Sequence, residues 1–274
     1  MLQFIKYRKI WYIFSSILLL ASIASLFVYK LNLGIDFTGG SILEVNGTIN
    51  ELPKDIKFDI QKTQNGAILR FKPVDEETHQ RILEKIGAEE VQFESMGPVI
   101  GRELKSKAFW AIGIVVILII FYIAFAFRKI QNPFKYGLIA VIALCHDVLI
   151  SVGAFSFLNL EINTAFIAAI LTVLGYSVND TIIVFDRIRE NMIKLPKEDL
   201  GIIINKSINQ TLRRSIFTSL TVILTLMAIL FFGGETIKSF ALALIIGITI
   251  GTYSSIFIAS PLLITLKRPV EIKK

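Results

Sequence analysis

Cysteine and charged residues are both scarce in this 274-residue sequence. The single cysteine, Cys145, excludes a disulfide within the chain and excludes a metal site built from cysteines. Only 19% of the residues are charged, whereas about 25% is typical of a soluble globular domain. The net charge of +7 does not indicate a nucleic-acid-binding surface, because the basic residues lie at the ends of apolar segments. We therefore expect no nucleic-acid partner, no metal and no cofactor.

Apolar residues, in contrast, make up 54% of the chain and are clustered. They form blocks of about 17–27 residues, the length that a helix needs to cross about 30 Å of hydrocarbon. The blocks predict six transmembrane helices, at residues 10–28, 108–127, 137–160, 165–185, 216–232 and 240–266. Pro261 is expected to kink the last helix near its end, because proline removes one hydrogen bond from the helix.

The first apolar block is open to two interpretations. It could be a cleavable signal peptide, with Ser22-Ile23-Ala24 as a cleavage site of small residues. The apolar run continues beyond that site to Val28, however, and is then long enough to span the membrane. We therefore favour an uncleaved anchor.

The distribution of lysine and arginine predicts the orientation. With both termini in the cytoplasm, residues 1–9, 128–136, 186–215 and 267–274 lie inside and carry 17 of the 29 basic residues, as the positive-inside rule requires. The long segment 30–107 then lies outside, where its 11 basic residues are roughly balanced by 13 acidic ones. This divides the chain into an N-terminus with the first helix (1–29), an outer domain (30–107), helices two to six (108–266) and a cytoplasmic tail (267–274).

The outer domain has the pattern of a small α+β unit. Alternating apolar residues predict strands at 41–45, 58–62, 67–71 and 91–94, and Asn65-Gly66 favours a tight hairpin turn between the second and third. Helical spacing over residues 76–86 predicts a helix that ends at Gly87. We expect a ferredoxin-like sheet in which one helix is missing or degenerate around residues 49–54.

Polar residues inside the predicted third helix need an explanation, because a charged group in lipid is costly. His146 and Asp147 lie about 15 Å deep, and Asp147 shares a helix face with small residues that suit close helix contact. Asp147 is either a functional group or a protonated carboxyl that serves packing, and the residues leave both open. For His146 we favour a structural hydrogen bond over a proton relay.

The fourth and fifth helices carry a second set of polar residues. Asn179 and Asp180 lie near the cytoplasmic end of the fourth helix, and Arg214 begins a stripe on the fifth helix that continues with Thr218, Thr221 and Thr225. Because the two helices run in opposite directions, Asp180 and Arg214 come to similar depths. We expect an ion pair between them, whose separation would let Asp180 take a proton. The stripe could line a hydrated path or serve packing between helices.

Two further patterns favour structural roles. Asp186 with Arg189 and Arg187 with Asn191 have the spacing of paired residues on one helix, and together with Glu190 they suggest an interfacial cluster that sets helix depth. Small residues on the sixth helix recur every fourth position, which is typical of a tight packing face: Ala243, Gly247, Gly251, Ser255 and Ala259.

Several segments resemble motifs of the SecD/SecF family. Residues 34–40 (G-I-D-F-T-G-G) are similar to its entry motif, which here comprises Asp36, Phe37, Gly39 and Gly40, and residues 96–101 are similar to its V-G-P-x-x-G segment. Residues 143–149 and 175–191 resemble the third-helix and fourth-helix motifs of its SecF branch, and residues 209–215 with Thr218 fit the start of its fifth helix. The segments occur in the family order over nearly the whole chain.

The resemblance implies both a fold and a function. It implies one half of a resistance-nodulation-division bundle, located in the bacterial inner membrane. It implies an auxiliary, non-enzymatic subunit that acts with SecD, the SecYEG channel and usually YajC, and that uses the proton-motive force to promote export of polypeptide chains. By motif position, the proton-linked groups of the family fall on Asp180 and Arg214, while Asp36 falls on a turn between the first helix and the outer domain.

Three other interpretations stay open at this point. A lipid or drug exporter of the same superfamily would use six helices as half of its unit. An intramembrane aspartyl protease would use Asp147 and Asp180 as a pair that shares a proton, although the G-x-G-D arrangement of such proteases is absent. A passive scaffold would carry the charged residues for packing alone and leave the coupling to SecD.

Overall fold

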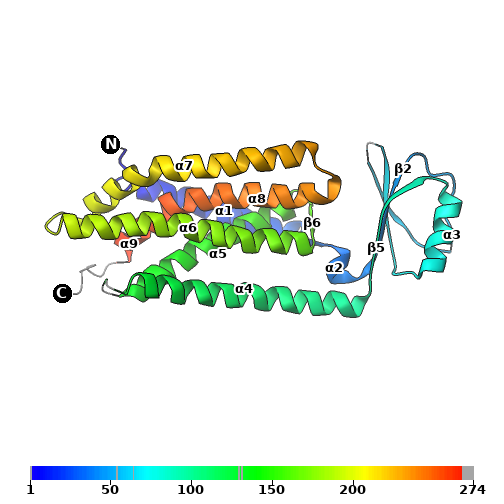
Figure 1. Ribbon diagram of the computed structural model, residues 1–274, viewed down its shortest axis with the longest axis horizontal. Helices are drawn as coiled ribbons and strands as arrows, with labels where there is room; N and C mark the ends of the chain where they lie inside the picture. Colours follow the sequence, from blue (N-terminus) through cyan, green and yellow to red (C-terminus); the bar gives the residue numbers. More distant parts are fainter. Residues whose placement is uncertain (1, 54, 64, 129, 131, 267–274) are drawn as a thin grey trace. The chain divides into compact units, whose positions relative to one another are not determined.

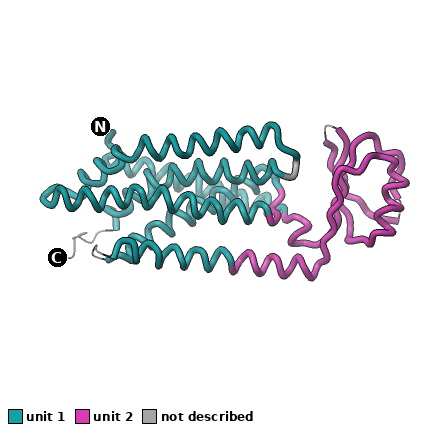
Figure 2. The backbone as a smooth tube through the Cα atoms, in the orientation of Figure 1, with its two compact units in different colours: residues 1–32, 111–160, 165–274 teal, residues 33–110, 161–164 magenta. Residues whose placement is uncertain are grey.

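The computed structural model describes residues 2–53, 55–63, 65–128, 130 and 132–266 (Figure 1), so the predicted tail at 267–274 lies outside the described residues. The chain divides into two compact units (Figure 2). Unit 1 comprises residues 1–32, 111–160 and 165–274, and unit 2 comprises residues 33–110 and 161–164. Each unit is therefore built from separate stretches of the sequence.

Within the described residues, six helical stretches are long and apolar enough to cross a membrane, as predicted. They are α1 (Arg8–Val28), α4 (Pro98–Ala126), α5 (Pro133–Phe157), α6 (Thr164–Lys194), α7 (Leu200–Phe232) and the stretch Ile237–Thr265. Several begin earlier or end later than their apolar blocks, since hydropathy marks the membrane crossing and not the end of the helix. Thus α4 begins at Pro98, a residue favoured in the first turn of a helix.

The last of these stretches is not a regular α-helix. It consists of α8 (Glu235–Ser254), a π-helical segment η1 (Ser255–Ala259) and α9 (Ser260–Thr265). Pro261 lies in the first turn of α9 and has no N–H with which to continue the hydrogen bonds of the preceding turn. The Ser260 hydroxyl instead donates to the Ser255 carbonyl at 2.8 Å. Where a kink was predicted at Pro261, the structure has a wide π-helical turn just before it.

The core of unit 1 lies around α5, α6 and the last stretch, where half or more of the span is buried; only 17% is buried in the spans of α1, α4 and α7. Phe127 and Tyr136 stack at 5.4 Å, and Phe185 of α6 packs edge-on against both. The small residues predicted to form a packing face on the sixth helix are all buried: Ala243, Gly247, Gly251, Ser255 and Ala259.

Unit 2 contains a four-stranded antiparallel sheet with the order β3-β4-β2-β5 among the described residues. The strands are β2 (Gly40–Asn46), β3 (Asp59–Lys62), β4 (Gly66–Phe71) and β5 (Glu89–Met96), which agrees with the four predicted. Leu43 and Leu69 pair across β2 and β4 and pack with Ile82 and Ile86 of helix α3 (Glu76–Ile86). Of the stretch 49–54, where a helix was expected to be missing or degenerate, residues 49–53 form no helix and residue 54 lies outside the described residues.

Helix α3 begins and ends at the residues that its sequence predicts. The Asp75 side chain accepts a hydrogen bond from the Thr78 amide at 3.1 Å, and the bonds from Thr78 hold the pKa of this carboxyl below its usual range. Gly87 ends the helix in the left-handed conformation, with φ of 66°.

Two short strands, β1 (Asn32–Leu33) and β6 (Glu161–Ile162), pair with each other, and the short helix α2 (Ile35–Thr38) follows β1.

Candidate functional site

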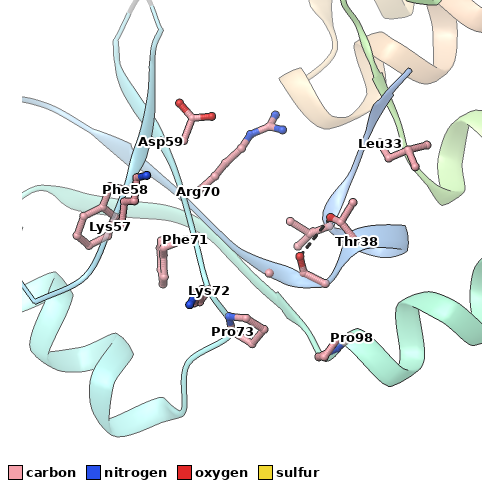
Figure 3. A pocket seen from close by; sticks show the side chains of 13 residues that line it. Leu33, Thr38, Lys57, Phe58, Asp59, Arg70, Phe71, Lys72, Pro73 and Pro98 are labelled. Carbon is pink, nitrogen blue, oxygen red and sulfur yellow. Dashed lines mark hydrogen bonds between the residues drawn. The ribbon is translucent and has the colours of Figure 1, made fainter. Parts of the chain in front are cut away.

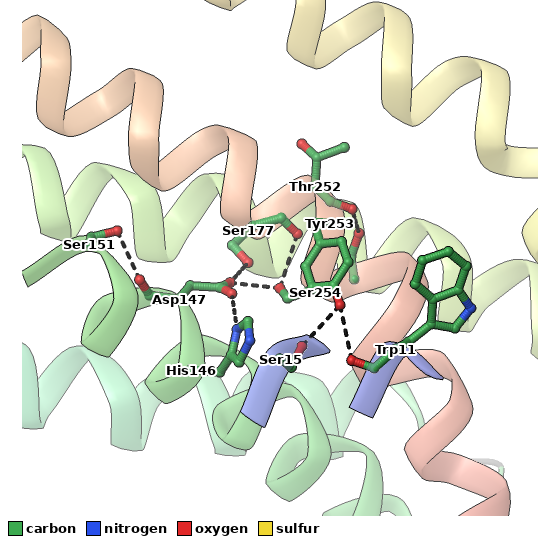
Figure 4. Close-up of polar contacts among 11 residues, drawn as sticks. Trp11, Ser15, His146, Asp147, Ser151, Ser177, Thr252, Tyr253 and Ser254 are labelled. Carbon is green, nitrogen blue, oxygen red and sulfur yellow. Dashed lines mark hydrogen bonds and ion pairs between the residues drawn. The ribbon is translucent and has the colours of Figure 1, made fainter. Parts of the chain in front are cut away.

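Asp147 on α5 is completely buried, with 0% of its surface exposed, and its carboxylate has partners on three helices (Figure 4). The Ser177 hydroxyl of α6 donates to Oδ2 at 2.7 Å, and the Ser254 hydroxyl of α8 donates to the same oxygen at 2.8 Å. The neighbouring His146 places Nδ1 3.0 Å from Oδ1. Helices α5, α6 and α8 therefore meet at this carboxylate.

Asp180 on α6 has a similar environment. It is 4% exposed, and the Ser215 hydroxyl of α7 donates to Oδ1 at 2.5 Å. The Ser255 hydroxyl, the first residue of η1, donates to Oδ2. The same hydroxyl oxygen lies 3.0 Å from the Thr252 carbonyl, which is a second acceptor for its single hydrogen. Helices α6, α7 and η1 thus meet at Asp180 through hydroxyl groups.

The predicted ion pair between Asp180 and Arg214 does not form in this structure, where no ion pair joins them among the described residues. Ser215 occupies the position next to the carboxylate instead. Successive residues of an α-helix point about 100° apart, so when Ser215 faces Asp180 the adjacent Arg214 faces outward, where it is exposed.

Ser254 and Ser255, which we call the serine pair, are consecutive and contact different carboxylates. They lie where α8 changes into η1. The sequence interpretation missed Ser254 entirely and gave Ser255 only a packing role. The run Thr-Tyr-Ser-Ser at 252–255, in the middle of an apolar span, is the signal that could have drawn attention to them.

Thr252 and Tyr253, the two residues before the serine pair, contact α7 and α1. The Thr252 hydroxyl lies 2.5 Å from the Ser219 hydroxyl of α7. The Tyr253 hydroxyl lies 3.0 Å from the Ser15 hydroxyl of α1 (Figure 4). Residues 252–255 therefore contact α1, α5, α6 and α7 through polar groups.

The threonine stripe of α7 does not join this network among the described residues. Thr218 donates to the Arg214 carbonyl at 2.8 Å, and Thr221 and Thr225 likewise donate to carbonyls of their own helix. All three are exposed, as is Asn179 of α6. Their polar groups thus lie on the outer surface of unit 1, apart from the buried carboxylates.

Ion pairs form among the residues predicted to make an interfacial cluster, with one change of partner. Asp186 pairs with Arg189 at 2.5 Å, as expected from the spacing. Arg187 pairs with Glu190 at 2.6 Å, so the expected contact with Asn191 is replaced. Asn191 is buried and faces α7, where its amide donates at 2.8 Å to two side chains, those of Ser207 and Gln210.

The entry motif of unit 2 places Asp36 at the beginning of α6. Oδ2 of Asp36 accepts from the Thr164 amide at 2.7 Å and from the Thr164 hydroxyl at 2.6 Å. Phe37 is buried, and Gly39 and Gly40 have φ of 75° and 144°, which favour glycine. A Cβ on Gly39 would lie 2.9 Å from the backbone of Pro98, so this motif packs against the start of α4. The entry motif (34–40) and the V-G-P-x-x-G-like segment (96–101) therefore pack against each other.

A cavity of about 510 Å³ lies beside this motif in unit 2 (Figure 3). It is lined by Phe58 and Phe71 together with Lys57, Lys72 and the motif glycines. None of its charged lining residues pair with one another among the described residues, and Arg70 pairs with Glu161 instead. We assign no chemistry to this cavity.

Neither a metal centre nor a carboxylate dyad is formed by the described residues. Within the part of the chain that the structure describes, no group of three or more His, Cys, Asp or Glu side chains gathers in a way that could hold a metal. No hydrogen bond joins Asp147 to Asp180 within the described part of the chain, whereas an aspartyl protease needs two carboxylates close enough to share a proton. Their separate sets of hydroxyl partners argue against the protease interpretation.

Comparison with known proteins shows which family these features accompany. Residues 77–269 match the family model for the protein export membrane protein SecD/SecF, C-terminal, and residues 24–46 match that of the SecD/SecF GG motif. The chain belongs to the SecD/SecF family. The GG-motif match contains Asp36 and both motif glycines, and the C-terminal match contains both buried carboxylates and the serine pair.

Individual relatives within the SecD/SecF family agree. The chain is 42% identical to the protein translocase subunit SecF of Sebaldella termitidis, over 97% of this chain and 92% of that one. It is 40% identical to the subunit of the same name from Thermobaculum terrenum, over 97% of this chain and 94% of that one. The family predicted from the sequence is thereby confirmed.

Solved structures of this family share the fold. The crystal structure of SecDF, a translocon-associated membrane protein from Thermus thermophilus, matches with a TM-score of 0.86 at 33% identity. The match covers 97% of this chain and 38% of that longer chain. A structure of SecDF in a super-membrane-facing form matches with a TM-score of 0.73 over the same shares. The predicted fold class, six apolar helices with a small sheet region, is confirmed.

Proposed function

We propose that this protein is a subunit of a bacterial protein-export translocase, with its six helices in the inner membrane and residues 30–107 outside. The names of its relatives support a role in export. The longer SecDF chain contains a part that this chain does not match, and we propose that a SecD-type subunit supplies it. The SecYEG channel, YajC, membrane lipid and exported polypeptide chains complete the proposed set of partners.

The proposed coupling to protons centres on Asp180. A carboxylate only accepts hydrogen bonds, whereas a protonated carboxyl also donates one. Ser255 has one hydrogen and two acceptors within reach, Asp180 and the Thr252 carbonyl. When Asp180 takes a proton at Oδ2, Ser255 turns its hydrogen to Thr252 and the link between α6 and η1 changes.

Asp147 has the same alternative built into it. The Ser254 hydroxyl lies 2.8 Å from Asp147 and 3.1 Å from the Gly251 carbonyl. Its single hydrogen can therefore also be donated to either of two acceptors. Ser254 and Ser255 are consecutive. A change in the hydrogen bond between one serine and its carboxylate therefore shifts the backbone of the other serine. In this proposal Asp147 and Asp180 respond to protons together through the serine pair.

Arg214 contributes to this proposal through its charge. Its guanidinium is exposed on α7, where Arg214 is the neighbour of Ser215, the residue that donates to Asp180. An ionised carboxylate inside a low-dielectric region is costly, and a nearby positive charge lowers that cost. Arg214 therefore favours the charged form of Asp180 without contacting it.

The observation that carries the proposal is a buried carboxylate whose hydrogen bonds, among the described residues, come from hydroxyl groups of two other helical segments. The test is Asp180→Asn, which keeps the size of the side chain and removes its titration. We expect this variant to lose the increase in export that a proton gradient produces in membrane vesicles, while it still copurifies with the SecD-type subunit.

The control is Asp199→Asn. Asp199 caps α7 by accepting from the Gly201 amide at 2.7 Å, and asparagine caps a helix equally well, so export is expected to stay normal. Full proton-dependent export by Asp180→Asn would contradict the proposal. It would favour the passive scaffold, in which the hydroxyl groups around both carboxylates serve packing alone.

A further inference from the structure

Helix α6 begins within unit 2 and continues through unit 1. Thr164, its first residue, belongs to unit 2, and the helix enters unit 1 from residue 165 onward. The 31 residues from Thr164 to Lys194 form one α-helix, so a single element carries both Thr164 and Asp180. The same helix carries Ser177, which donates to Asp147. Both buried carboxylates are thus connected to α6: Asp180 belongs to the helix, and Asp147 accepts a hydrogen bond from it.

The first turn of α6 is held by the entry motif of unit 2. The amide groups at the N-terminus of a helix have no partners within it, and Asp36 supplies an acceptor to the amide and the hydroxyl of Thr164. A second bond joins the preceding strand to the same motif, since the Gly34 amide donates to the Ile162 carbonyl at 2.9 Å. Negative charge at this end of the helix is also favoured by the helix dipole.

The sheet of unit 2 holds the same segment through an ion pair. Arg70 of β4 donates to Glu161 of β6, and their side chains are only 26% and 18% exposed, so water screens the pair less than it would on an open surface. Glu161 also packs against Gly34, where a Cβ would lie 2.5 Å from Oε1. Residues 161–164 are therefore tied both to the motif and to the sheet.

Helix α4 also passes from unit 2 into unit 1, but it has no comparable contact with the carboxylates. Among the described residues, no hydrogen bond joins α4 to Asp147 or Asp180. The hydroxyl partners of both carboxylates come from α6, α7, α8 and η1. Of these two helices, α6 is the one that has contacts at both carboxylates in the described part of the chain.

We propose that Asp36, Arg70 and Glu161 form a clamp that passes proton-dependent movement of α6 to the sheet of unit 2. They act as positioning residues, because their hydrogen bonds in the described part of the chain go to Thr164 and to one another. The inference rests on the proposed function, which supplies the movement. The clamp supplies the path by which that movement reaches the domain proposed to lie outside.

The test measures a probe on unit 2 in the intact complex. In a Cys145→Ser background, a fluorophore is attached to a cysteine placed at Gln61, which is exposed on β3, and its signal is recorded in vesicles as a proton gradient is applied. We expect a gradient-dependent signal from the wild-type clamp. Arg70→Met and Thr164→Val are each expected to lose it, because each removes one donor of the clamp and leaves α6 intact.

Two matched variants separate coupling from general loosening. Thr164→Ser keeps the hydroxyl that donates to Asp36 and should restore the signal that Thr164→Val loses. Arg81→Met breaks an ion pair with Asp55 in the same unit, at 2.9 Å and away from α6, and should leave the signal unchanged. Loss of signal in Arg81→Met, or no restoration by Thr164→Ser, would overturn the clamp.

The outcomes distinguish the clamp from the proposed function. If Asp180→Asn abolishes the signal while Arg70→Met and Thr164→Val keep it, the clamp is wrong and the proton-linked function stands. If Asp180→Asn keeps both the signal and the proton-dependent export, the proposed function fails. An unchanged protein that shows proton-dependent export but no gradient-dependent signal at Gln61 would also overturn the clamp.

Discussion

At the scale of single residues, both buried carboxylates depend on hydroxyl groups from other helices. A buried group that loses a hydrogen-bond partner costs about 1–3 kcal/mol, and more when it is charged. Asp147 and Asp180 each have two such donors from other helical segments, and one donor of each belongs to the serine pair. Small hydroxyl side chains therefore control the free energy of both buried carboxylates.

Ser255→Ala tests this control. The substitution removes one donor from Asp180 and keeps a small residue at a buried position. Because a hydrogen bond to a charged group contributes about 1.5–3 kcal/mol, we expect proton-dependent export to fall about tenfold or more. The measurement is the rate of export into membrane vesicles with and without a proton gradient.

Ser151→Ala is the matched control, because the Ser151 hydroxyl is equally buried but donates to the Asp147 backbone carbonyl at 2.8 Å. Its export should remain close to that of the unchanged protein. Equal losses in the two variants would mean that any buried hydroxyl matters for packing, and that Ser255 has no special relation to Asp180.

At the scale of elements, the packing of α1 against α5 depends on a close approach at Gly153. A Cβ on this residue would lie 2.3 Å from the Ser22 Cβ and 2.6 Å from the Ser22 Cα. The second of these atoms belongs to the α1 backbone, so the two helices would have to move apart. Ser22 is itself buried at this contact.

Gly153→Ala is therefore expected to destabilise the bundle by about 1–3 kcal/mol, the usual range for an overpacked core. The measurement is the thermal unfolding midpoint in detergent, which should decrease. Gly113→Ala on α4 is the control, since a Cβ there meets no atom within 4 Å and alanine favours a helix over glycine. An unchanged midpoint for Gly153→Ala would show that α1 can shift on α5 without loss.

At the scale of the whole molecule, the exposed apolar surface indicates a membrane environment. Large side chains on α1, α4 and α7 are exposed, among them Phe27, Phe109, Trp110 and Phe232. Soluble monomers rarely expose contiguous apolar patches of this kind. Lipid and the helices of the proposed SecD-type partner are the surroundings that would cover them.

The proposed orientation can be tested by cysteine labelling. In a Cys145→Ser background, single cysteines at Lys62 in unit 2 and at Lys197 between α6 and α7 are treated with a maleimide that does not cross membranes. In intact cells from which the outer barrier has been removed, we expect Lys62→Cys to react. Lys197→Cys should react only after the inner membrane is opened. The reverse pattern would contradict the placement of residues 30–107 outside and of both termini inside.

The sequence by itself determined the six spans, the four strands and the family. These features are local: a run of apolar residues, an alternation with period two, or a motif such as G-I-D-F-T-G-G can be recognised without knowing what packs against it. Asp147 and Asp180 could be found in the same way, because an acid within an apolar span is conspicuous in a single helix.

Only the tertiary structure decided which residues meet these acids. Asp180 and Ser255 are 75 positions apart, and whether Ser215 or Arg214 faces Asp180 depends on the rotation of α7 in the bundle. Serine gives no local signal of its partner, since its hydroxyl can equally donate to its own helix, as Ser207 does to Ile203. The contact of Asp36 with Thr164, 128 positions away, was hidden for the same reason: side-chain partners are set by the packing of distant segments.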